Sequence, residues 1–184
     1  MKNLFLLFFF VSSVLSESQE DILRDLREEN VPYAQEKPIS SEDYLEKLKS
    51  IHRLVTTALE NRLDNQAIEE GKKLEKYGIT PDRLNLSGKK ELGEREILYL
   101  KIRRLRAEAY YNLREFNLAL SDSKFIVENH PKPVVFDFTR YAVSLYYSGD
   151  AKGSKRILTQ AKSRFKNEND QNILSKTDQL LFPN

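Results

Sequence analysis

The chain of 184 residues contains no cysteine. It therefore has no disulfide bond, no thiolate ligand for a metal ion and no cysteine nucleophile. Small secreted eukaryotic domains usually depend on disulfides, whereas helical proteins of the bacterial periplasm often lack them. If the chain is exported, packing alone must hold it together, and a bacterial cell envelope is the favoured destination.

Glycine and proline are scarce, at six residues each, and tryptophan is absent. Charged residues make up 32% of the chain and are interleaved with leucine, isoleucine and tyrosine. This composition is typical of helices rather than of β-sandwiches. The sequence therefore predicts an all-α fold.

The chain also lacks a large net charge, because 30 basic and 28 acidic residues leave a formal charge of +2. A balance this even creates no broad field that would recruit nucleic acid or an anionic membrane without specificity. The net charge thus supports neither partner, and we expect no nucleic-acid partner.

Long hydrophobic runs are missing as well, apart from residues 4–11. Lys2 precedes this run, and small residues follow it up to Ser16. This order is typical of a secretory signal peptide, which we predict over residues 1–16. It is too short to cross a hydrocarbon layer of about 30 Å as a helix. We predict cleavage after Ser16, with Ser18 as the alternative site and an uncleaved N-terminal anchor as the competing interpretation.

These features predict an exported protein that is periplasmic or associated with the envelope, with secretion from the cell as the alternative. The mature chain would have no integral membrane span, while peripheral membrane association stays open. Residues 17–40 follow the signal peptide as a short, highly charged helix and a linker with Pro32 and Pro38.

Apolar residues recur at spacings of three and four over most of residues 41–184, which form the predicted domain. Polar or glycine-containing breaks divide this pattern into antiparallel helical hairpins followed by a closing helix. The connection over residues 82–93 is polar and unusually long. The predicted hairpins cover residues 41–78, 94–129 and 134–166, and the closing helix covers residues 169–182.

The second and third hairpins repeat each other at a constant offset of 35 residues. This offset aligns Ala107 with Ala142, Tyr110 with Leu145, Arg114 with Gly149, Ala119 with Ser154, and Ile126 with Ala161. Small residues recur where two helices would touch. Residues 107–131 are predicted to form a helix, a tight turn and a second helix that ends at Pro131. This pattern resembles one unit of the tetratricopeptide repeat family.

The resemblance covers about residues 48–166, and it implies a short right-handed superhelix of stacked hairpins; a plain helical bundle is the alternative. Three arginines depart from the family pattern in the middle unit. Arg103 and Arg106 stand where the family usually has a large apolar pair, and Arg114 replaces the turn glycine.

The resemblance also implies a binding face on the first helix of each hairpin, suited to an extended peptide or helix of acidic character. Glu108 stands where family members that grip a terminal carboxylate have an asparagine, so no such clamp is predicted. The residues expected on this face are Lys49, His52, Lys101, Arg104, Glu108, Tyr111, Phe136, Thr139 and Tyr146, together with Thr56, Leu59 and Val143.

No catalytic motif stands out: the two histidines, His52 and His130, lack metal-ligand spacing, and nucleophile-elbow and phosphate-loop patterns are missing. We therefore expect no enzyme activity, no cofactor and no bound metal. The expected function is that of an adaptor or scaffold for an unidentified protein partner. The alternative is a structural subunit of an envelope assembly that associates through its outer surface or residues 17–40.

Overall fold

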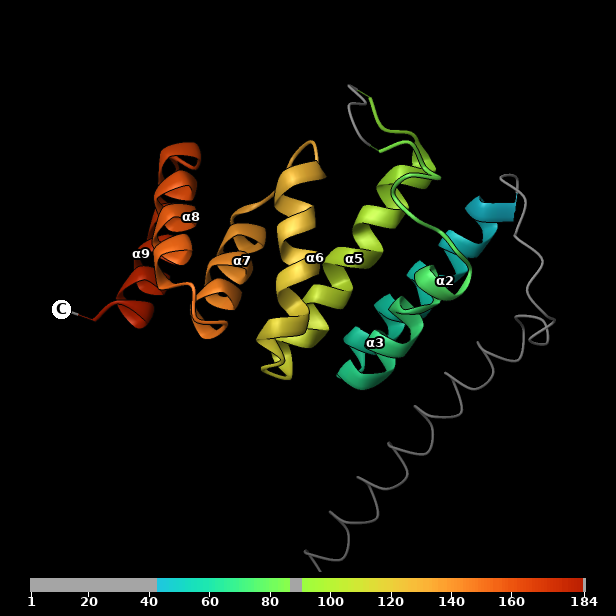
Figure 1. Cartoon of the computed structure of the whole chain (residues 1–184), viewed down its shortest axis with the longest axis horizontal. Helices are drawn as coiled ribbons and strands as arrows, with labels where there is room; N and C mark the ends of the chain where they lie inside the picture. Colours follow the sequence, from blue (N-terminus) through green and yellow to red (C-terminus); the bar gives the residue numbers. More distant parts are fainter. Residues whose placement is uncertain (1–42, 87–90, 184) are drawn as a thin grey trace, which may run out of the picture.

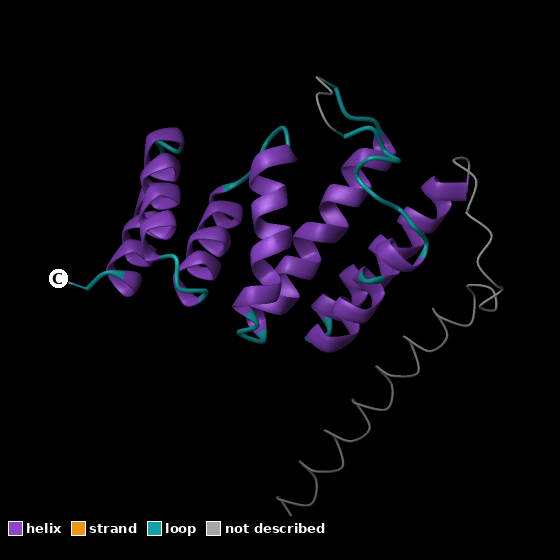
Figure 2. Cartoon of the chain, in the orientation of Figure 1, coloured by secondary structure: helices purple, strands orange, loops and turns teal. Residues whose placement is uncertain are grey.

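The computed structural model describes residues 43–86 and 91–183, and these residues form helices and no strands (Figures 1 and 2). The predicted signal peptide and the whole of residues 17–40, with the predicted short helix and linker, lie outside the described ranges. The helices are α2 (Asp43–Glu60), α3 (Asp64–Gly71), α4 (Lys73–Lys76), α5 (Glu94–Asn112), α6 (Phe116–Asn129), α7 (Val135–Tyr147), α8 (Ala151–Arg164) and α9 (Glu168–Leu181).

The helices stack side by side in chain order, from α2 at one end to α9 at the other (Figure 1). Helix α5 packs against α2, α3 and α6; α7 packs against α6 and α8; and α9 covers α7 and α8. The predicted all-α fold of antiparallel hairpins is confirmed, and the helix bounds from α5 onward agree with the periodicity to within one or two residues.

Three turns between helices share one pattern of backbone hydrogen bonds. The amides of Arg62, Arg114 and Gly149 donate to carbonyls three residues earlier, and the next amide in each turn donates to a carbonyl five residues earlier. All three residues have positive φ. This is the Schellman arrangement that closes a helix, and it is also found at Gly78 and Asn85.

The interior consists of two hydrophobic clusters that meet at α6. The first draws on α2, α3, α5 and α6, and the second on α7, α8 and α9. Ala119 and Ile126 of α6 belong to the first cluster, whereas Phe116, Leu120 and Val127 pack against the second. Helix α6 is therefore a wall shared by both clusters.

Two expectations about the core need correction. The connection after α4 is not purely polar, because Leu84 and Leu86 are buried in the first cluster. The apolar residues of the predicted closing helix are also not all covered: Leu180 is 81% exposed, whereas Leu174 and Leu181 are the buried residues of α9. The periodicity of a short helix does not distinguish these neighbouring positions.

The second helix of the predicted hairpin over residues 41–78 is interrupted, and α3 ends at Gly71. The Nη1 atom of Arg106 donates to the Gly71 carbonyl at 3.1 Å, and the Arg106 stem lies where a side chain at position 71 would stand. Glycine at this position thus lets α5 approach α3 closely. In a continuous helix, the Gly71 carbonyl would accept a backbone N–H group of the next turn.

Arg103 and Arg106 of α5 both bind Asp122 of α6. Arg103 Nε and Arg106 Nε each lie 2.6 Å from a carboxylate oxygen of Asp122, and Arg106 also binds Glu75 at 2.8 Å. The Arg103 guanidinium stacks 3.9 Å above the Phe125 ring. Burial alone would lower the pKa of Arg106, but its bonds to Asp122 and Glu75 raise it, so the guanidinium stays charged.

Candidate functional site

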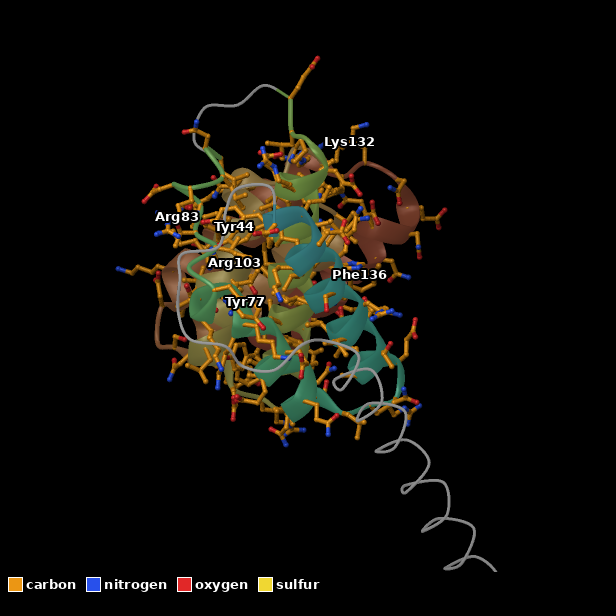
Figure 3. All side chains as sticks on the ribbon, turned by 90° about the vertical axis from the view of Figure 1, so that its right-hand side faces the viewer. Tyr44, Tyr77, Arg83, Arg103, Lys132 and Phe136 are labelled. Carbon is orange, nitrogen blue, oxygen red and sulfur yellow. The ribbon has the colours of Figure 1, made fainter. Side chains whose placement is uncertain are left out.

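The predicted binding face lies along α2, α5 and α7, and these first helices contact one another in sequence. Lys49, Lys101 and Phe136 are exposed on it, and His52, Arg104, Glu108, Tyr111 and Tyr146 are partly exposed. Figure 3 shows Phe136 and Lys132 on one side of the stack and Arg103 and Tyr77 on the other. The structure therefore keeps most of the expected residues accessible on one set of helices.

Thr139 does not belong to the accessible face, contrary to the sequence-based expectation. Its side chain is buried, and its hydroxyl donates to the Phe136 carbonyl at 3.1 Å. The resemblance to the repeat pattern placed position 139 on the face, whereas the structure leaves only 8% of Thr139 exposed. Thr139 thus supports α7 rather than a ligand.

Arg104 is held by a partner inside the protein. Its Nε and Nη2 atoms donate to the two oxygens of Asp137 at 2.9 and 2.7 Å, which is a two-point contact between α5 and α7. Asp137 is buried and also accepts the Val134 amide at 2.8 Å at the start of α7. Arg104 therefore fixes the spacing of two first helices, a role that the sequence pattern did not indicate.

Glu108 makes the second link between the same helices. Arg140 Nη2 lies 2.5 Å from Glu108 Oε2, and the Arg140 side chain is mostly buried. The negative charge that argued against an acidic ligand is therefore neutralised locally. Sequence reasoning missed Arg140 and Asp137 because each meets its partner about 32 residues away along the chain.

Lys101 is the exposed cation at the centre of the face, and in the described part of the chain no ion pair engages it. Burial and the Lys101 charge lower the pKa of His52, and burial, Arg104 and Lys101 lower that of His130. Both histidines are consequently neutral at pH 7. Lys49 lies nearby but is shared with Glu46 at 3.2 Å and Glu94 at 3.9 Å.

Five aromatic rings form a continuous series at the turn end of the hairpins. We call this set the aromatic ladder; its members, in order of contact, are Tyr111, Phe116, Tyr147, Tyr146 and Phe182. Successive ring centroids lie 5.7, 4.4, 5.5 and 5.3 Å apart. The stacked pair at its centre includes Tyr147, which is 60% exposed, whereas the other four rings are half-buried.

Only Tyr111 and Tyr146 of the aromatic ladder were expected from the sequence. Phe116, Tyr147 and Phe182 come from three other places in the chain: the first residue of α6, the end of α7 and the residue after α9. The signal that could have found Tyr147 is its position beside Tyr146 at a turn. Phe182 is brought to Tyr146 only by the packing of α9 on α7.

Other kinds of site find little support in residues 43–86 and 91–183. These residues contain no group of three or more histidine or carboxylate side chains placed to hold a metal ion. None of their helices combines the length and apolar character needed to cross a lipid bilayer. A shallow hollow on α2 is lined by charged residues and Ser50 and lacks converging apolar walls.

The face therefore combines a cation at its centre, fixed ion pairs between helices and an aromatic edge, which together suit the recognition of another polypeptide. No known protein family, curated protein or solved structure matches the chain.

Proposed function

We propose that this protein is an exported, non-catalytic adaptor or scaffold of the bacterial envelope, which binds a peptide or helix of a partner protein through the face of α2, α5 and α7. The observation that carries the proposal is the aromatic ladder with its exposed Tyr147. Tyrosine offers a large contact area at a small cost in conformational entropy, and it is enriched at the centres of protein interfaces.

The surroundings of the aromatic ladder support the same function. Lys101 is free to attract an acidic side chain, which would orient the partner and raise the association rate. The ion pairs of Arg104 with Asp137 and of Glu108 with Arg140 hold α5 and α7 in place before binding. A face ordered in advance loses less entropy when it binds.

The proposal is tested by capturing partners from an envelope extract and then titrating the purified partner. We expect Tyr147→Ala combined with Lys101→Glu to weaken binding by at least tenfold, because both an anchor and a steering charge are lost. Leu118→Ala combined with Lys124→Glu is the matched control, since Leu118 is 53% exposed and both residues lie on α6. Equal affinity of the test variant and the wild type would refute this binding face.

Deletion of residues 17–40 separates this function from that of a structural subunit. The proposed face lies on described helices that the deletion leaves intact, so partner affinity is expected to stay within a factor of two or so of the wild type. A complete loss of association would favour assembly through the N-terminal segment instead.

A further inference from the structure

Helix α8 carries an excess of positive charge, although the net charge of the whole chain is small. This helix carries five lysines and arginines and no acidic residue among its 14 residues. Its outer side is open to solvent and carries Lys152, Lys155, Arg156, Thr159, Gln160 and Ser163. We call these six residues the α8 outer face.

Few acidic groups compensate this charge. Asp178 of α9 binds Lys155 at 2.7 Å and Lys162 at 2.6 Å. Asp150 is engaged at the start of α8, where it accepts the Gly153 amide at 2.8 Å. Lys152 and Arg156 are exposed, and within residues 43–86 and 91–183 neither takes part in an ion pair. A local excess of positive charge therefore remains.

The shape of the α8 outer face indicates the kind of partner. All six residues come from one helix, so the face is an outward ridge rather than a groove between two helices. It has no aromatic or aliphatic anchor of the kind that dominates protein interfaces or stacks on bases. Ile157, Leu158 and Ala161 fix the opposite side of α8 in the second hydrophobic cluster.

We propose that the α8 outer face binds the surface of an anionic phospholipid membrane. Lipid phosphates form an extended, flat array of negative charge that a rigid cationic ridge can contact along its length, without any apolar insertion. Lys152 and Arg156 would make the main contacts, and Lys155 would add to them in part because it is shared with Asp178. The α8 outer face meets the aromatic ladder at one point, because the Lys155 Nζ atom lies 4.8 Å from the centroid of the Phe182 ring. The two residues expected to make the main contacts, Lys152 and Arg156, do not belong to the aromatic ladder.

The test is co-sedimentation of the full chain with vesicles of phosphatidylcholine alone and of phosphatidylcholine mixed with phosphatidylglycerol. Residues 1–16 contribute equally in every variant, so the ratio of the two partition coefficients isolates the anionic effect. We expect Lys152→Gln combined with Arg156→Gln to reduce this ratio by about 25-fold, because each cation near such a surface contributes about fivefold. The effect should shrink as salt is raised.

Lys124→Gln combined with Lys176→Gln removes the same charge from exposed sites on α6 and α9 and serves as the control. The proposal requires that this control retain most of the wild-type ratio. Equal loss in both double variants would show that only total charge matters and would overturn the site. It would also be overturned if the wild type ignored anionic vesicles, or if the α8 variant lost binding to duplex DNA while keeping binding to vesicles.

Discussion

Arg114 and Gly149 occupy the same left-handed backbone position, at φ 62° and 93°, in turns that lie 35 residues apart. Glycine adopts this conformation freely, whereas a residue with a Cβ atom pays about 1 kcal/mol or more. The second hairpin therefore keeps the turn of the third at a local cost. This pair of residues provides a direct measure of that cost.

We expect Arg114→Gly to stabilise the protein by about 0.5 kcal/mol and Gly149→Ala to destabilise it by about 1 kcal/mol, because the first change relieves strain and the second introduces it. A Cβ atom at position 149 would meet no heavy atom within 4 Å, so backbone strain is the only penalty there. Urea unfolding measures both changes. Arg114→Ala is the control, since it removes the side chain and keeps the strain; a gain equal to that of Arg114→Gly would contradict this explanation.

Replacement of Asp122 by alanine is expected to destabilise the protein by about 3–5 kcal/mol, because it leaves Arg103 and Arg106 partly buried without their shared carboxylate. The free energy of unfolding in urea measures the loss. Lys124→Ala on the same helix breaks an exposed pair with Glu128 at 3.9 Å and should change stability by no more than about 0.5 kcal/mol. Similar losses of stability in the two variants would show that the Asp122 ion pairs contribute no more than an exposed ion pair.

The contact between Arg104 and Asp137 should appear as a coupling energy in a double-mutant cycle. We expect Arg104→Ala and Asp137→Ala to couple by about 1–2 kcal/mol, since the two groups share a two-point bond and Asp137 is buried. Asp137→Ala alone should cost more than Arg104→Ala, because it also removes the acceptor of the Val134 amide. Additive losses would mean that the two helices are held by packing alone.

The two histidines predict a loss of stability in mild acid. The pKa values of both histidines are lowered in the folded protein, so the unfolded chain binds more protons. The stability that is present above the unfolded pKa of about 6.5 is therefore lost as the pH falls through the folded pKa. His52→Gln combined with His130→Gln should flatten the pH dependence of the midpoint of thermal unfolding. Lys101→Gln should raise the pKa of His52, as measured by NMR titration; an unchanged or lower value would contradict the assigned electrostatics.

The hairpins were predictable because their helices carry long apolar periodicities and end at turns with clear signals. The second hairpin is the best example: residues 94–129 were assigned almost to the residue, and α5 and α6 end within that range. Arg114 was identified as a departure from the turn pattern, and the structure shows that it nevertheless adopts the glycine conformation. Local sequence was sufficient wherever the deciding interactions were also local.

The candidate site was harder to predict because its residues are brought together only by the packing of one helix against another. No periodicity links Glu108 to Arg140 or Phe116 to Tyr147. The first contact follows from the packing of α5 on α7, and the second from the packing of α6 on α7. Thr139 shows the opposite error, since the resemblance assigned it to an accessible surface although the residue is buried. The excess of positive charge on α8 was also not apparent from the net charge of the whole chain, which is near zero.

The shared wall formed by α6 has a consequence for how the protein is made. All helices that enclose the first hydrophobic cluster precede residue 130, so this half can close before the C-terminal helices have emerged. Phe116, Leu120 and Val127 then present a finished template on which α7, α8 and α9 can assemble. We expect vectorial folding from the N-terminus, and a nascent chain stalled after α9 but lacking α6 should remain susceptible to protease throughout.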